Sequence, residues 1–220
     1  MVIKKRAISD QQKEERRQAI LAAGLELYQD TSYEAVNIVQ VTQKAGVAKG
    51  TFYLYFKTKE ELFLAMLAQE FEEWFDEIDA GLTTIQTTQG TCSIDEFIGR
   101  VGSTLENRST LIRLIAILHA VLEQNVEFDT AYHFKQMLLN RIDYTGALME
   151  AILPFLKPGD GMFLMLHTYA LIIGVQQLAA PAPIIRQVIE EKELRAFQID
   201  FMEYFLATLR IFLNGLQVTD

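Results

Sequence analysis

Cysteine is nearly absent, since Cys92 is the only one in the 220-residue chain. A disulfide framework and a Cys-x-x-Cys metal or redox motif are therefore excluded, and a reducing, cytoplasmic setting is the simplest interpretation. Proline and glycine are also scarce, with four and 12 residues. Because few residues break the chain while half of it is hydrophobic, we predict an ordered protein built from long helices.

The sequence also lacks a hydrophobic run of clear membrane-spanning length. Residues 161–185 carry no formal charge, but their densely apolar part, 162–175, is short and contains His167. Such a length indicates a buried core helix, and we expect no contact with a membrane. The charged residues at the N-terminus precede no apolar run, so no signal peptide is expected.

Patterns of catalytic or metal-binding residues are missing as well. His119, His133 and His167 fall on separate predicted helices, with no His-x3-His spacing and no carboxylate–histidine pair. We therefore expect core or surface histidines and no metal site. Neither a nucleophile elbow, a P-loop nor a dinucleotide-binding loop occurs, which argues against an enzyme and against a cofactor.

Positive and negative residues are unevenly distributed along the chain. Residues 1–60 hold ten Lys and Arg against seven Asp and Glu, a net charge of +3, whereas residues 61–220 hold ten against 22, a net charge of −12. A basic head on an acidic body suits a protein that binds a polyanion with one end. Taken alone, a charge of +3 over 60 residues is also unremarkable.

Apolar spacing and helix-capping residues predict an all-α fold of about nine helices. The first helix begins near Ser9 or Asp10, and Thr58 with Glu61 forms a capping box before a long helix. A Thr-rich stretch, 83–91, is expected to be a loop, and Asp160 is expected to be an N-cap. The helices expected beyond that loop span 93–106, 109–124, 128–155, 160–179 and, from 187 or 193, up to 215.

Two short helices near the N-terminus are joined at Gly46. The first spans about 37–44, with Asn37 as N-cap and Gln40 three residues later, and the second spans about 48–54. Glycine reaches the positive φ angles of a sharp turn without steric cost. This arrangement predicts a helix-turn-helix.

The segment from Ala45 to Phe63 reads AGVAKGTFYLYFKTKEELF. Its apolar members Val47, Phe52 and Phe56 are suited to anchor a small core, which leaves the polar side chains between them on the surface. Gly50 exposes bare backbone near a helix start, where N–H groups favour phosphate.

This segment resembles the DNA-binding signature of the tetracycline-repressor (TetR/AcrR) family, and the resemblance covers about residues 10–65. It implies a three-helix DNA-binding head at residues 1–60 and a ligand-binding and dimerisation body at residues 61–220. Residue by residue, it implies that DNA is contacted by Asn37, Lys49, Gly50, Thr51, Tyr53, Tyr55 and Lys59. Asn37 has the alternative of a helix cap alone, and Tyr53 that of packing within the head.

The segment departs from the family pattern at a few positions. Ala48 replaces the common Ser, which removes a hydroxyl cap, and Thr42 stands where Ala is usual. Leu54 stands where some members carry a polar or aromatic residue, so direct base readout there is limited to apolar contact with a thymine methyl.

The body is rich in aromatic and methionine side chains, which suit a cavity for a small, mostly apolar ligand. The residues predicted to line it are Trp74, Leu118, Leu122, Met137, Arg141, Tyr144 and Tyr169. Arg141 is included because it could meet a ligand carboxylate, and its alternative is a surface ion pair.

The resemblance also implies that the last two long helices pair with those of a second copy. Because 160–179 is apolar nearly all round, a monomer would expose much of it. The residues predicted at this interface are Tyr169, Gly174, Phe201, Phe205 and Phe212. A two-fold dimer implies a palindromic operator in double-stranded DNA.

These observations predict a DNA-binding transcriptional regulator, in the form of a repressor that a small molecule releases. An activator, a regulator without a ligand and a helical protein-interaction module remain as alternatives. The sequence identifies neither the ligand nor the operator.

Overall fold

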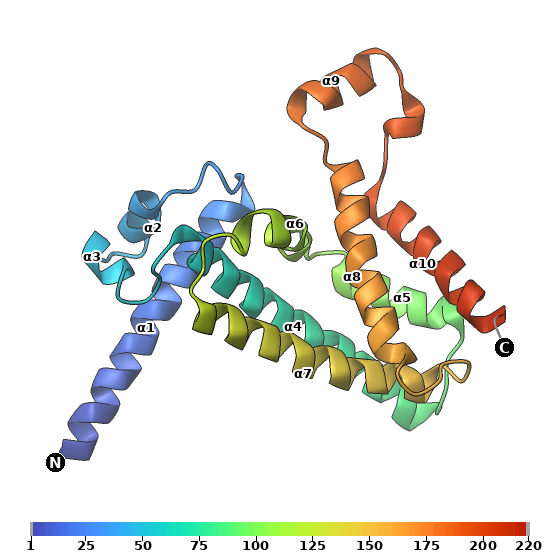
Figure 1. Cartoon of the computed structure of the whole chain (residues 1–220), viewed down its shortest axis with the longest axis horizontal. Helices are drawn as coiled ribbons and strands as arrows, with labels where there is room; N and C mark the ends of the chain where they lie inside the picture. Colours follow the sequence, from blue (N-terminus) through green and yellow to red (C-terminus); the bar gives the residue numbers. More distant parts are fainter. Residues whose placement is uncertain (1, 219–220) are drawn as a thin grey trace. The chain divides into compact units, whose positions relative to one another are not determined.

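The computed structural model describes residues 2–218, with side chains from residue 11 onward, and this part of the chain is all-α (Figure 1). It forms ten α-helices, one more than expected, together with a π-helical turn, η1, and a 3-10 turn, η2, and it contains no strand. The elements are α1 Val2–Gln29, α2 Ile38–Lys44, α3 Lys49–Phe52, α4 Lys59–Thr88, α5 Ile94–Leu105, α6 Ser109–Ile117, η1 Leu118–Leu122, α7 Phe128–Ile152, α8 Asp160–Ala179, α9 Pro183–Glu191, η2 Arg195–Phe197 and α10 Phe201–Val218.

The chain folds into two compact units. The first contains the chain up to Glu70 together with Ile117–Phe134, and the second contains Phe71–Ala116 together with the chain from Lys135 onward. The long helices α4 and α7 each pass from one unit into the other. The first unit therefore includes a segment from the middle of the sequence in addition to the helix-turn-helix.

The core of the first unit is aromatic where α1 and α4 pack together. The Phe63 ring lies edge-on to Tyr28, with centroids 5.2 Å apart, and to Tyr33 at 4.9 Å. Gly24 allows this approach, because a Cβ at that position would lie 2.9 Å from the Met66 sulfur. Burial of Ile20, Phe52 and Phe63 from three separate helices holds the unit together through the hydrophobic effect.

In the second unit, α10 packs against both α5 and α8. Phe97 and Phe205 are fully buried in this core. Helices α7 and α8 meet at Gly146 and Gly161, where the two backbones leave no room for a Cβ on either residue. These contacts cover one side of α8 only.

Helix α8 is one continuous 20-residue helix, longer than the apolar run of 162–175 suggests. By length and composition alone it would also pass as a membrane span, a test that core helices of soluble proteins pass as well. Only 28% of its most apolar 18-residue window is buried within this chain, so one face of α8 is core and the rest is exposed, as the sequence predicted for a monomer.

Several element boundaries differ from those predicted. Helix α4 continues to Thr88, so most of the expected loop at 83–91 is helical. The hydroxyls of Thr84, Thr87 and Thr88 each donate to a carbonyl three or four residues earlier, which lets a Thr-rich stretch remain helical. Helix α1 begins at Val2 rather than near Ser9, as the charged N-terminal residues continue the same helix.

The C-terminal half departs further from the prediction. The helix expected at 109–124 changes to π-helical geometry at Leu118, the expected helix 128–155 ends at Ile152, and the last helix starts only at Phe201. Asp160 is not the N-cap of α8. That position belongs to Gly159 at φ 98°, and the Asp160 carboxylate instead accepts from the Lys157 N–H at 2.8 Å.

Candidate DNA-binding surface

Helix α2 begins with the predicted capping box. The Asn37 side-chain oxygen accepts from the Gln40 N–H at 3.0 Å, and the Gln40 side chain accepts from the Asn37 N–H at 3.1 Å. Two backbone donors at the helix start are thus satisfied within the chain. Asn37 is exposed, and its amide NH2 group is not used by the cap.

The turn between α2 and α3 is made by Gly46 at φ +66°. The Val47 N–H donates to the Thr42 carbonyl at 3.0 Å and closes the turn. Thr42 itself is buried, and its hydroxyl donates to the Val39 carbonyl at 3.0 Å. The departure from the usual Ala is therefore accommodated by a local hydrogen bond.

Helix α3 is a single turn, shorter than the predicted 48–54, and the chain continues past Phe52 in hydrogen-bonded turns. Its N-cap, Ala48, offers no side-chain hydrogen bond, which helps to explain the short length. Phe52 and Phe56 are buried in the first unit. Val47, the third predicted anchor, is only half-buried.

The opposite side of α3 and its turn faces solvent. Lys49, Gly50 and Tyr53 are exposed, and Leu54 is 79% exposed. Thr51 and Tyr55 are half-buried. No atom lies within 4 Å of the place where a Cβ on Gly50 would stand, so packing does not require glycine there. Lys49, Gly50 and Tyr53 are thus accessible, and together they offer a cation, bare backbone and a phenol.

Lys59 lies at the start of α4 and is half-buried. Its ammonium group donates to the Tyr33 carbonyl and lies 3.9 Å from the centre of the Tyr33 ring. Burial lowers the pKa of Lys59, while the nearby carboxylates of Glu34 and Glu60 act in the opposite direction. Lys59 therefore ties α4 to the turn after α1, in addition to any contact with DNA.

A hydrogen-bond network centred on Glu60 joins the turn after α1, the start of α4 and Asn125. The Tyr33 hydroxyl donates to Glu60 at 2.7 Å, and Asn125 donates to the other oxygen of Glu60 at 3.3 Å. Burial opposes ionisation of Glu60, but these hydrogen bonds prevail and lower its pKa. Burial and the bond to Glu60 together raise the pKa of Tyr33.

Glu61 is 5% exposed and joins the same network. The Glu61 N–H donates to the Thr58 hydroxyl at 3.1 Å, which is one half of the predicted capping box. The other half is missing, because the Glu61 carboxylate accepts from the Lys57 N–H at 2.7 Å and not from the Thr58 N–H. This carboxylate also accepts from the Glu127 N–H at 3.2 Å. Asn125 and Glu127 are thereby attached to the start of α4, a role that the sequence did not predict for either residue.

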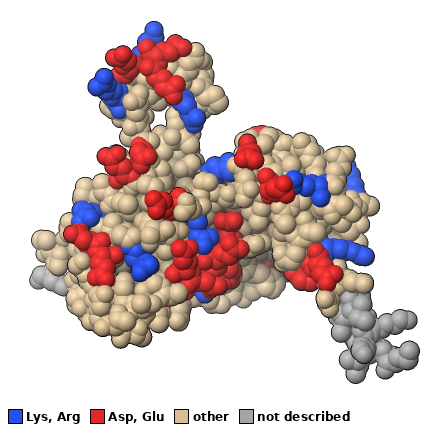
Figure 2. All heavy atoms as spheres, turned by 180° about the vertical axis from the view of Figure 1, so that it is seen from behind, with Lys and Arg blue, Asp and Glu red and all other residues tan. Residues whose placement is uncertain are grey.

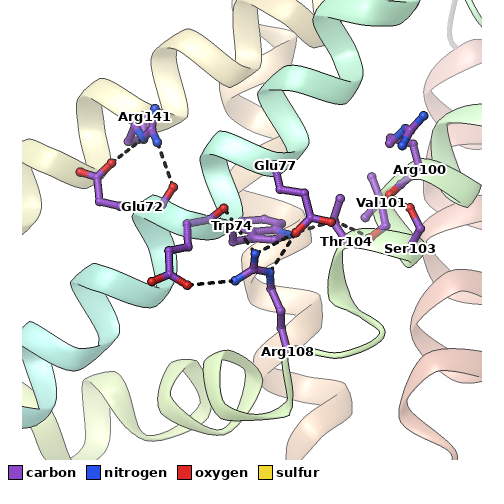
Figure 3. Close-up of polar contacts among 10 residues, drawn as sticks. Glu72, Trp74, Glu77, Arg100, Val101, Ser103, Thr104, Arg108 and Arg141 are labelled. Carbon is purple, nitrogen blue, oxygen red and sulfur yellow. Dashed lines mark hydrogen bonds and ion pairs between the residues drawn. The ribbon is translucent and has the colours of Figure 1, made fainter. Parts of the chain in front are cut away.

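The predicted ligand-binding residues are divided between the two units. Leu118 and Leu122 are fully buried in the first unit. Trp74, Met137, Arg141, Tyr144 and Tyr169 belong to the second, where Trp74 is buried and Tyr144 is exposed. The Trp74 indole N–H donates to the Thr104 hydroxyl at 3.0 Å, so its polar group is already satisfied (Figure 3).

Arg141 lies beside acidic side chains of α4. Its guanidinium pairs with Glu72 at 2.9 Å, with Asp76, and with Asp79 at 3.6 Å (the pair with Glu72 is drawn in Figure 3). This arrangement is the ion pair that the sequence left open as the alternative for Arg141. Burial alone would lower the pKa of Arg141, but the hydrogen bond to Asp76 and the charges of the nearby carboxylates outweigh it and raise this pKa.

Asp79 is the buried member of this cluster. One carboxylate oxygen accepts from the Thr145 hydroxyl at 2.6 Å, and the other has no hydrogen-bond partner. Burial raises the pKa of Asp79, although Thr145 and Arg141 partly offset it.

A pocket of about 320 Å³ lies elsewhere in the second unit. It is lined by Cys92, Ser93, Ile94, Asp95, Pro154, Phe155, Asn214 and Gln217, a set that includes no predicted ligand-binding residue. Burial, followed by the charge of Glu96, raises the pKa of the Cys92 thiol. Among the described residues, no group of three or more His, Cys, Asp or Glu side chains could hold a metal ion.

The residues predicted at a dimer interface differ in accessibility. Gly174 is exposed on α8, whereas Phe205 is fully buried in its own chain and serves as core. Phe201 and Phe212 are half-buried, the former stacked on Phe205 with centroids 5.6 Å apart. Tyr169 is also half-buried.

Two known families match the chain and together cover most of it. Residues 20–66 match the family described as bacterial regulatory proteins, tetR family, and residues 68–220 match the family described as Tetracyclin repressor-like, C-terminal domain.

Relatives match mainly in the N-terminal part. The chain is 45% identical over 65 residues to the HTH-type transcriptional repressor KstR of Rhodococcus jostii (strain RHA1), which covers 30% of this chain and 31% of KstR. It is 28% identical over 68 residues to the fatty acid metabolism regulator protein of Bacillus subtilis (strain 168), covering 31% of this chain and 35% of the relative. The chain thus matches about a third of the length of these relatives.

Solved structures resemble the fold over nearly the whole chain. The multidrug binding protein EbrR, solved with imidazole, has a TM-score of 0.59 at 20% identity and covers 91% of this chain and 94% of its own. FadR of Bacillus subtilis, solved with stearoyl-CoA, has a TM-score of 0.56 at 16% identity, with 90% and 98% covered. At these identities the likeness concerns the fold alone. The two family matches and the helix-turn-helix establish that the chain belongs to the TetR family of DNA-binding transcriptional regulators, which are not enzymes.

Proposed function

We propose that this regulator is a homodimeric repressor that binds a palindromic operator through residues 1–60. The observation that carries the proposal is the surface of α3, where Lys49, Gly50 and Tyr53 are exposed while Phe52 and Phe56 anchor the opposite side. A short helix held in this way can enter the major groove with its N-terminal residues toward the bases. Thr51 and Tyr55 would reach phosphates or bases of the same groove, and Asn37 and Lys59 would contact phosphate.

Exposed apolar side chains on α8 and α10 support the dimer. Phe163 and Leu166 are 45% and 50% exposed on α8, and Tyr204 and Ile211 are 46% and 72% exposed on α10. Apolar surface on two adjacent helices favours pairing with the same surface of a second copy. Tyr169, Gly174, Phe201 and Phe212 would lie in or beside this interface.

A small, mostly apolar ligand is proposed for the body, residues 61–220. EbrR and FadR, which share the fold, were solved with imidazole and with stearoyl-CoA, so this fold accommodates organic ligands. Of the predicted contacts, Trp74, Met137, Tyr144 and Tyr169 belong to the second unit and are the candidates there. Arg141 would bind a ligand carboxylate only if that carboxylate displaced Asp76, the most exposed of the three acidic partners of Arg141.

The ligand would release the protein from DNA by shifting the equilibrium between two conformations of the dimer. A ligand that binds better to one arrangement of the two heads makes that arrangement more populated. If its head spacing does not match successive major grooves, affinity for the operator falls. Such a protein would act in the cytoplasm, where the operator is accessible.

The test is selection of bound fragments from random and genomic DNA by the purified protein, followed by a salt titration. An enriched palindrome with a steep salt dependence is the expected result. A folded dimer that enriches no sequence would contradict the proposal and favour a protein-interaction module.

A relative in Mycolicibacterium smegmatis, FasR, is a transcriptional activator, 32% identical over 72 residues. Transcription in vitro from the selected operator separates repression from activation.

A further inference from the structure

His167 lies in the exposed apolar surface of α8, a helix that packs against α10 (Figure 1). At about 100° per residue, Phe163 and Gly174 lie within about 40° of His167 around this helix, and all three residues are exposed. The His167 ring centre lies 3.8 Å from that of Phe163, and the ring is stacked on Phe212 of α10 at 5.1 Å. His167 is therefore part of the surface that a second copy is proposed to cover.

The hydrogen bond of His167 decides which ring nitrogen can gain a proton. Nδ1 lies 2.8 Å from the carbonyl oxygen of Phe163. Because a carbonyl oxygen only accepts, Nδ1 carries a hydrogen, and the neutral ring is the Nδ1–H tautomer. Nε2 is then the atom that takes up a proton from water and makes the ring positively charged.

Helix α8 offers no carboxylate to pair with a charged His167. Residues 161–185 carry no formal charge. Asp160 shares the face of His167 but lies two turns away, about 10 Å along the helix axis. The Asp160 carboxylate accepts from the Lys157 N–H instead.

Neighbouring elements also hold their charged groups away from this ring. On α10, Glu203 and Arg210 lie about 180° and 160° around the helix from Phe212. On α7, Glu150 accepts from backbone N–H groups at the start of α8. Charged side chains between α8 and α10 gather in the lobe at the top of Figure 2, whereas His167 precedes the end of α8 by about three turns. A charged His167 is therefore solvated by water and by two aromatic rings.

A second copy that covers this surface would remove the water. Burial of an unpaired charge is far more costly than burial of a neutral imidazole. In a two-fold pair the partner presents the same α8–α10 surface, so it brings no carboxylate to His167. The stacking on Phe163 and Phe212 is present in the single chain and in the dimer alike, so it leaves this difference unchanged. Proton binding and dimerisation therefore oppose each other.

We propose that protonation of His167 dissociates the dimer, so that the regulator loses its operator as the pH falls through the range in which histidine gains a proton. The inference rests on the proposed dimer. Because the monomer binds protons that the dimer excludes, dimer affinity is complete at high pH and is lost as the pH falls. A monomer holds only one half-site and lacks the affinity that two linked heads provide.

Sedimentation equilibrium of the whole chain between about pH 8 and about pH 5.5 tests this coupling, because histidine is the side chain that ordinarily titrates there. The dissociation constant of the dimer should rise at least about tenfold, and about a hundredfold if neither buried imidazole accepts a proton. Where the dimer is too tight for sedimentation, exchange between copies labelled at the N-terminus with donor and acceptor dyes measures its dissociation rate.

Two variants assign the effect to one histidine. His167→Gln should keep the dissociation constant the same at every pH, because an amide does not titrate. His133→Gln, at an exposed histidine of α7, is the matched control and should keep the wild-type pH dependence.

The outcomes separate the histidine from the dimer. A wild-type dimer whose dissociation constant does not vary with pH, or varies equally in His167→Gln, would overturn the role of His167 and leave the proposed dimer intact. A protein that is monomeric even at about pH 8 would overturn both. Circular dichroism at each pH should show undiminished helix, and dissociation that accompanies loss of helix would also overturn the role of His167.

Discussion

The carboxylate of Glu61 accepts a hydrogen bond from the backbone N–H of Glu127, at 3.2 Å, across 66 positions of sequence. Its other oxygen accepts from the N–H of Lys57, the residue after the buried Phe56, at 2.7 Å. One buried side chain thus joins the end of the helix-turn-helix to the chain that precedes α7. Thr58 adds a second link, because its hydroxyl donates to the Asn125 carbonyl at 2.8 Å.

Replacement of Glu61 by Gln is therefore expected to destabilise the protein. A carboxamide keeps the size of the side chain but presents an NH2 group to one of two backbone donors, so a buried N–H loses its acceptor. The expected loss in the free energy of unfolding is about 1–3 kcal/mol, measured by urea denaturation. Glu106→Gln, at an exposed position, is the control and should change little. Equal stability of both variants would show that the link to Glu127 contributes nothing.

Local features of the head were predictable because they depend on neighbours in sequence. Asn37 and Gln40 form the expected capping box, and Gly46 has the expected positive φ. The link between Glu61 and Glu127 was not predictable, since nothing in either segment identifies a partner 66 residues away. The Thr-rich stretch before Gln89 was misjudged because its hydroxyls bond back to the helix instead of breaking it.

The body was predictable only in outline. Helical spacing indicates α7 and α8, but it cannot say which apolar residues face a second copy. Phe205 illustrates this limit, because its spacing on α10 suits either an interface or a core and the structure buries it completely. Arg141 likewise has acidic partners on a helix that precedes it by more than 60 residues. Tertiary packing decides both cases.

Lys59→Ala should affect both DNA binding and stability. Loss of one phosphate contact is expected to weaken binding to all DNA sequences and to reduce the salt slope by about one unit. Loss of the ammonium bond to the Tyr33 carbonyl should also lower the unfolding free energy by about 1 kcal/mol. Binding titrations at several salt concentrations and urea denaturation measure the two effects.

Lys57, which is exposed just before α4, provides a comparison for this variant. Lys57→Ala should leave stability unchanged. If Lys59→Ala lowers stability while the salt slope stays at the wild-type value, then Lys59 supports the head and does not bind phosphate.

Asp79→Asn should change the pH dependence of stability. Burial raises the pKa of Asp79 in the folded protein above its value in the unfolded chain, about 3.9. Between these two pKa values the folded state binds more protons, so this group makes the protein less stable as the pH rises. The neutral amide does not titrate.

Wild type should therefore lose stability relative to Asp79→Asn as the pH rises from about 4 through the raised pKa of Asp79 and then stay at a constant difference. Urea denaturation at intervals of pH up to about 7 measures this difference. A difference that does not vary with pH would contradict the raised pKa. Asp76→Asn, at an exposed carboxyl that also faces Arg141, controls for loss of the ion pair.

Substitutions of Gly50 and Gly46 by Ala distinguish a glycine needed for DNA contact from one needed for backbone conformation. Gly50 lies in α3, and no neighbouring atom comes within 4 Å of the place that an added methyl would take, so Gly50→Ala should raise stability by about 0.4–1 kcal/mol through lower entropy of the unfolded chain. The added methyl would stand on the surface proposed to approach phosphate, and we expect weaker operator binding. Gly46→Ala, at φ +66°, should instead lower stability by about 1–2 kcal/mol. Denaturation and operator titration of both variants check this pair, and a stable Gly50→Ala protein with undiminished affinity would place the DNA backbone away from α3.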